Sequence, residues 1–218
     1  MKDANAYIQR VYFWMFVGLL ITAATAFYVS TQPSIYEPLI QSDLFIVLLL
    51  AQLVTVGVLV AFIRRIPDAL AEVTFVLYTF ITGLTFSVIF LVFTISSIGL
   101  VFFITAGMFG FMSVYGYFTK TDLTSLGHIL TMLLFGLVLS LLMNLFLQNQ
   151  ILDIVLSLLG VLVFSGLAAH DTQKIKEIYE SDDPAEDLLK KEIIGALDLY
   201  LDFVNLFLSL IRLMGRRR

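Results

Sequence analysis

Cysteine is absent from this chain of 218 residues, and histidine occurs only twice. The absence of cysteine excludes disulfide bonds, thiolate metal sites and cysteine nucleophiles. Two histidines are too few for the usual ligand set of a transition-metal site, so we expect no cofactor. Charged residues make up only 14% of the chain and hydrophobic residues 60%, which excludes a soluble domain of ordinary surface composition. The composition therefore predicts a polytopic membrane protein, with no nucleic acid among its partners.

Long apolar runs divide the chain into seven segments, each of the length that a helix needs to cross a hydrocarbon core about 30 Å thick. We expect an all-α protein with one seven-helix transmembrane domain over residues 1–218 and no second domain. The connections are short except for residues 171–192, whose many charges predict a cytoplasmic loop. The predicted membrane-spanning segments are 11–30, 44–63, 73–95, 98–118, 128–147, 151–169 and 193–214.

Lysine and arginine in the connections predict the orientation. If every segment crosses the membrane, nine of these residues fall on one side, which the positive-inside rule makes the cytoplasmic side. The amino terminus is then cytoplasmic. The arginines at 216–218 would lie on the opposite side, so either the nine charges outweigh them or the last segment does not cross fully. The nine residues are Lys2, Arg10, Arg64, Arg65, Lys120, Lys174, Lys176, Lys190 and Lys191.

The last apolar segment, which contains "GALDLYLDFVNLFLSL" (195–210), carries an unusual row of polar residues. Asp198, Asp202, Asn205, Ser209 and Arg212 follow one another at spacings of four and three, which places them on one face of a helix. A carboxylate in hydrocarbon costs about 2.5–3.5 kcal/mol on insertion scales, so such a face turns toward other helices or a water-filled cavity. We therefore expect the last helix to lie centrally in the bundle.

Other charged residues lie at the same predicted depth as the acids of the last segment. Asp171 ends the sixth segment and Arg64 and Arg65 end the second, all at the cytoplasmic side. Two carboxylates held together in a partly dry site tend to share a proton, and a nearby arginine favours their ionised forms. The pattern predicts an acid-sensitive contact between helices. A simpler interpretation also stays open, in which Asp171 and Asp198 mark helix ends and the arginines only anchor the topology.

The fourth segment carries small residues at a regular spacing. Gly107, Gly110, Ser113 and Gly116 occur at every third position. Small residues at such spacing allow helices to approach closely, so we expect this face to pack against another helix, with a hinge as the alternative.

Three sequence blocks resemble the Bax inhibitor-1 family, also called transmembrane Bax inhibitor motif proteins. They are "FGFMSVYGYFTKTDLTSLG" (109–127), "FSGLAAHDTQKIK" (164–176) and "ALDLYLDFVNLFLSLIRL" (196–213), and the likeness extends over essentially the whole chain. The resemblance implies a seven-helix bundle with the last helix at its centre. It also implies a calcium leak controlled by pH through two aspartates and an arginine of the second helix.

Transferred to this sequence, the two aspartates are Asp171 and Asp202, and the arginine is Arg65, with Arg64 as the next candidate. Asp198, His170 and Asn205 are secondary candidates for the same site. Two residues depart from the family pattern. Thr82 stands before Gly83 where many relatives have glutamate, and His170 stands where many have tyrosine. A histidine beside the first aspartate could shift the pH response.

The predicted function is a pH-sensitive calcium-leak channel of the bacterial inner membrane, and not an enzyme. Calcium is the transported ion, and Asp171, Asp198 and Asp202 would offer it a weak transit site. Its partners would be the lipid bilayer, calcium ions and protons. Two alternatives stay open: a proton-coupled cation exchanger, and a non-transporting regulator that binds a membrane protease or a stress-response partner. An aspartyl intramembrane protease is not expected, because neither Asp171 nor Asp202 has a glycine-rich setting.

Overall fold

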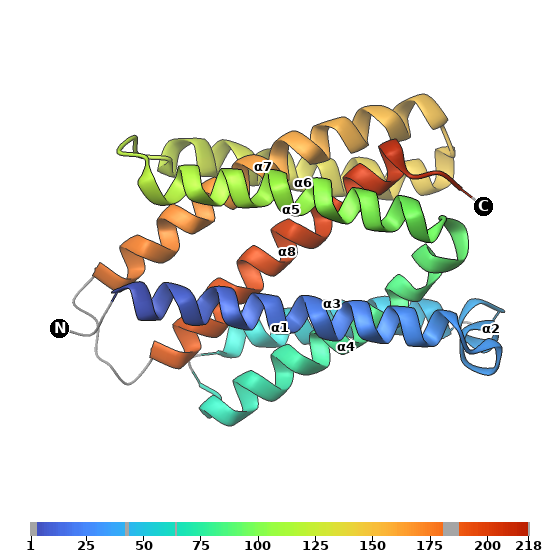
Figure 1. The fold of residues 1–218 in the computed structure, drawn as a ribbon, viewed down its shortest axis with the longest axis horizontal. Helices are drawn as coiled ribbons and strands as arrows, with labels where there is room; N and C mark the ends of the chain where they lie inside the picture. Colours follow the sequence, from blue (N-terminus) through green and yellow to red (C-terminus); the bar gives the residue numbers. More distant parts are fainter. Residues whose placement is uncertain (1–3, 42–43, 64, 181–187, 218) are drawn as a thin grey trace. The chain divides into compact units, whose positions relative to one another are not determined.

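The computed structural model describes residues 4–41, 44–63, 65–180 and 188–217. Within these ranges the chain forms eight α-helices and no β-strand (Figure 1). Seven of the helices are long and apolar enough to cross a membrane, which confirms the predicted all-α membrane fold. The helices are α1 (Ala4–Ser30), α2 (Pro33–Gln41), α3 (Leu44–Phe62), α4 (Asp68–Val92), α5 (Ile95–Phe118), α6 (Thr124–Leu147), α7 (Gln150–Glu180) and α8 (Leu188–Met214).

The helical state follows from the apolar sequence and its environment. A backbone in hydrocarbon has no water to bond, so it satisfies its N–H and C=O groups internally as a helix. The ends are set by local residues. Helix α4 begins directly after Pro67, and α6 ends where Gln148 adopts a left-handed conformation (φ 49°) and donates its N–H to the Asn144 carbonyl. Left-handed residues of this kind commonly terminate helices.

The short helix α2 was not predicted, because residues 31–43 contain no long apolar run. Its nine residues would span only about 13 Å, far less than the hydrocarbon core. The helix begins at Pro33, and proline suits the first helical position because no hydrogen bond needs its missing N–H there.

The predicted loop at residues 171–192 was wrong over the residues that the structure describes. Helix α7 continues to Glu180, and α8 already begins at Leu188. Hydropathy detects only the part of a helix that suits lipid, and a helix can extend into water with a charged sequence. Residues 181–187 lie outside the described ranges.

The chain separates into two compact units, which are described one at a time. The first contains α1 to α4 and α8 as far as Tyr200. The second contains α5 to α7 and α8 from Leu201. Asp198 thus belongs to the first unit and Asp202 to the second. The single seven-helix domain and the central place of α8 stay predictions.

In the first unit, α1 packs closely on α4. At Gly83 of α4, a Cβ atom would lie 2.9 Å from the carbonyl oxygen of Thr22 on α1, so only glycine allows this approach. The hydroxyl of Thr22 donates to the Thr79 carbonyl and lies 2.7 Å from the hydroxyl of Tyr200 on α8. Tyr200 also packs edge-on against Phe75. These contacts join α1, α4 and the first part of α8.

In the second unit, α7 contacts both α5 and α6 (Figure 1). A Cβ at Gly116 of α5 would overlap the backbone carbonyl of Ala169 on α7. A Cβ at Gly107 or Gly110 would meet nothing within 4 Å. The predicted small-residue face therefore makes a close helix contact at Gly116, whereas Gly107 and Gly110 face open space.

Candidate functional site

Asp202 is a buried carboxylate in the second unit. It lies in an apolar stretch of α8, and only 4% of the residue is exposed. The adjacent Phe203 packs edge-on against Phe102 and Phe109 of α5, with ring centroids 5.5 and 5.4 Å away. This stretch of α8 is therefore enclosed by protein rather than lipid, as a carboxylate at such a position requires.

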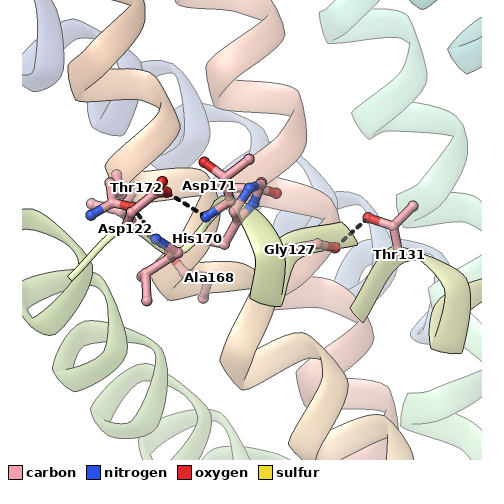
Figure 2. Close-up of polar contacts among 10 residues, drawn as sticks. Asp122, Gly127, Thr131, Ala168, His170, Asp171 and Thr172 are labelled. Atoms are coloured by element: carbon pink, nitrogen blue, oxygen red, sulfur yellow. Dashed lines mark hydrogen bonds and ion pairs between the residues drawn. The ribbon is translucent and has the colours of Figure 1, made fainter. Parts of the chain in front are cut away.

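Asp171 lies in α7 and is paired with its neighbour His170. The Nδ1 atom of His170 is 2.7 Å from an oxygen of Asp171, and the two side chains are 17% and 14% exposed (Figure 2). The imidazole lies against α6 at Gly127, where a Cβ atom would overlap the ring. The histidine that departs from the family pattern therefore makes a direct contact with the predicted pH sensor.

The loop between α5 and α6 is held beside this pair by α7. The buried amide of Gln173 accepts a hydrogen bond from the Leu123 N–H (2.8 Å) and donates one to the Thr121 carbonyl (2.9 Å). The hydroxyl and the backbone N–H of Thr124 lower the pKa of the Asp122 carboxyl, and nearby His170 lowers it further. The His170 region thus sits next to a second carboxylate that stays ionised.

Some of the other polar side chains in the row along α8 form hydrogen bonds within that helix. The amide of Asn205 donates to the Leu201 carbonyl, and the hydroxyl of Ser209 donates to the Asn205 carbonyl, both at 2.8 Å. Ser209 also lies against α7 at Gly160, where a Cβ would overlap its hydroxyl. Arg212 is exposed. The regular spacing predicted that these residues share one face of the helix. Asn205 and Ser209, however, donate their hydrogen bonds to backbone carbonyls of α8 itself.

The remaining predicted residues belong to the first unit or to undescribed positions. Asp198 is half-buried, and its charge acts on the hydroxyl of Tyr7 in α1. Arg65 is exposed in the turn after α3, where its N–H donates to the Phe62 carbonyl. Arg64 lies outside the described residues. Because Arg65 and the two aspartates of the second unit are not placed relative to each other, their contact stays a prediction.

Sequence reasoning missed a buried acid in the first unit. Glu192 of α8 has a side chain only 3% exposed, and its carboxylate lies 3.4 Å from the guanidinium of Arg10 on α1. The charge pattern predicts a loop at Glu192 and makes Arg10 one of the residues that indicate the orientation. One feature of the sequence could have indicated that Glu192 lies in a helix. The residues from Leu188 onward lead into the apolar segment without a proline or a cluster of glycines, which would end a helix.

The three aspartates that were predicted to contact calcium are divided between the two units. Among the residues that the structure describes, no three His, Asp or Glu side chains gather closely enough to hold a metal ion. Transit of calcium past Asp171, Asp198 and Asp202 stays a prediction.

Comparison with known proteins places the chain in a family. Residues 4–218 match the sequence model of the family described as inhibitor of apoptosis-promoting Bax1. Inner membrane protein YbhL of Escherichia coli (strain K12) is 46% identical over 217 residues, which cover 98% of this chain and 93% of YbhL. An uncharacterized protein of Rickettsia prowazekii (strain Madrid E) is 40% identical over 220 residues, which cover 100% of this chain and 92% of that protein. Matches of this length and identity lead to one conclusion: the chain belongs to the Bax inhibitor-1 family.

Proposed function

We propose that the protein is a pH-sensitive calcium-leak channel of the bacterial inner membrane. The observation that carries this proposal is the buried carboxylate of Asp202 in an apolar helix, because an acid is costly inside a membrane and typically marks an ion pathway or a proton relay. The location is supported by the seven apolar helices and by the similarity to an inner membrane protein of Escherichia coli.

In this proposal Asp171 and Asp202 form the gate and Arg65 is their partner. Acids that interact strongly titrate as one coupled unit. Loss of a proton would strengthen the attraction to a guanidinium, and gain of a proton would release it. His170 lies 2.7 Å from Asp171 and so contacts one of the two acids of the proposed gate. Calcium prefers six to eight oxygen ligands, so a site with few carboxylates binds it weakly enough for passage.

The test is calcium entry into liposomes that contain only this protein, measured with an enclosed calcium dye over a pH series. Asp171→Asn and Asp202→Asn should each abolish most of the pH dependence, and the double variant should add little, because coupled groups are not additive. Arg65→Ala should move the flux midpoint to higher pH. Asp153→Asn, at the other end of α7, is the matched control and should leave the midpoint unchanged.

Three outcomes would contradict the proposal. Strictly additive midpoint shifts in the two aspartate variants would exclude a shared gate. Absence of flux at every pH would favour a regulator that acts through a protein partner. Flux that stops when the proton gradient is removed would indicate an exchanger.

The predicted orientation has its own test. A reporter inserted within residues 178–186 should be active only in the cytoplasm, and a periplasmic signal would reverse the topology.

A further inference from the structure

A small pocket opens in the second unit where α5 ends. It has a volume of about 210 Å³ and lies between the end of α5, the loop that follows it and the last turns of α7. A small polar group of about that size would fit.

Fixed charges of both signs line the pocket. Lys120 and Lys176 contribute the positive charges, and Asp122 and Glu177 the negative ones. Hydrogen bonds from Thr124 lower the pKa of Asp122, so its carboxylate remains charged. Two lysines and two carboxylates in a pocket this small match a ligand that itself carries one anion and one cation.

The ammonium of Lys176 is held in place at the wall. It donates a hydrogen bond to the carbonyl oxygen of Tyr117 (3.3 Å) and lies 5.1 Å from the centroid of the Tyr117 ring. An ammonium has three N–H donors, so further donors remain for an anion. Gln173 fixes the loop on the other side through its two backbone hydrogen bonds.

The position of the pocket along the helices matches the headgroup level of a bilayer. Tyr115 and Phe118 at the end of α5 are 47% and 72% exposed, and aromatic residues concentrate at membrane interfaces. Helix α7 has 31 residues and is therefore about 46 Å long, more than the hydrocarbon core of about 30 Å. Its charged last turns, which carry Lys176 and Glu177, project past the apolar part.

We propose that this pocket binds the headgroup of a phospholipid with a primary ammonium. The phosphate would face Lys120 and Lys176, and the ammonium would donate hydrogen bonds to Asp122 and Glu177. A choline headgroup has no N–H to donate. A glycerol headgroup has no positive charge, so nothing in it would offset the repulsion between its phosphate and the two carboxylates. The pocket should therefore select phosphatidylethanolamine among these three lipids.

The experiment is a titration of the full-length protein in detergent with each of the three lipids, with bound lipid counted by native mass spectrometry. Phosphatidylethanolamine should bind about tenfold more tightly than phosphatidylcholine or phosphatidylglycerol, since one charge-assisted hydrogen bond contributes about that factor. Glu177→Gln should remove this preference, and Lys120→Gln, which loses a contact to the phosphate that the three lipids share, should weaken the binding of all three; both positions are exposed. Lys174→Gln is the matched control, because Lys174 is an exposed lysine of α7 that does not line the pocket.

Competition identifies the recognised group. Free phosphoethanolamine should displace the lipid, and inorganic phosphate at the same concentration should not. Equal binding of all three lipids, displacement by phosphate alone, or an effect of Lys174→Gln as large as that of Lys120→Gln would overturn the proposal. The measurement does not depend on calcium flux, so it can fail or succeed independently of the proposed channel activity.

Discussion

Substitution of Gly116 by alanine tests the closest helix contact of the second unit. The added Cβ would overlap the carbonyl oxygen of Ala169 and lie 2.8 and 2.9 Å from its carbonyl carbon and Cα. All three atoms belong to the backbone of α7, so no side-chain rotation relieves the clash and the two helices must move apart. Overpacking of this kind costs about 1–3 kcal/mol. Alanine also gains about 1 kcal/mol of helix propensity over glycine, which partly hides the steric cost.

Gly107→Ala is the matched control for this substitution. Gly107 lies in the same helix, and a Cβ there meets nothing within 4 Å. Both variants share the propensity gain, so the difference between them isolates the clash. We expect Gly116→Ala to be less stable than Gly107→Ala by about 1–3 kcal/mol. The assay is unfolding in mixed micelles by increasing sodium dodecyl sulfate, followed by far-ultraviolet circular dichroism. Equal stability of the two variants would refute the close approach of α5 and α7 at Gly116.

Three further substitutions test other contacts. Gln173→Ala should leave the buried Leu123 N–H of the α5–α6 loop without its partner, at a cost of about 1–3 kcal/mol, and should also remove the bond to the Thr121 carbonyl. Hydrogen exchange should then become faster in that loop, and unchanged exchange would contradict this. Thr124→Val should raise the pKa of Asp122 toward its ordinary value of 3.8 in a carbon-13 NMR titration. In the unsubstituted protein the lowered pKa of Asp122 stabilises the fold at pH values above the ordinary pKa, and this contribution is lost as the pH falls through the lowered pKa. An identical titration in the variant would exclude the Thr124 hydroxyl as a cause, because valine keeps the backbone N–H. Tyr200→Phe should cost about 0.6–1.7 kcal/mol and be non-additive with Thr22→Val, and additive losses would mean that the two hydroxyls do not interact.

The transmembrane helices could be predicted from the sequence because the decisive property is local. A run of about 20 apolar residues must form a helix in lipid wherever its neighbours lie. The helix ends were less predictable, since they depend on what lies beyond the apolar run. The last turns of α7, up to Glu180, carry many charged residues, but Ile175 among them is buried.

The acids of the candidate site could likewise be identified from the sequence. An aspartate in an apolar run, such as Asp202, stands out in composition and spacing, and its burial agrees with the expectation that it avoids lipid. The small residues of α5 also stood out, but their spacing did not distinguish the one that makes a contact. Gly107 and Gly116 are equivalent in the pattern, and only Gly116 meets another backbone.

The tertiary structure alone decided which distant residues meet. Glu192 pairs with Arg10 across 182 positions of the chain, and Gln173 bonds a loop about 50 positions away. The physical reason is that such contacts depend on the rotation of each helix about its axis and on its shift along its neighbour. Both are set by how all the side chains of two helices interlock, whereas the apolar run and the row of polar residues are properties of one helix by itself.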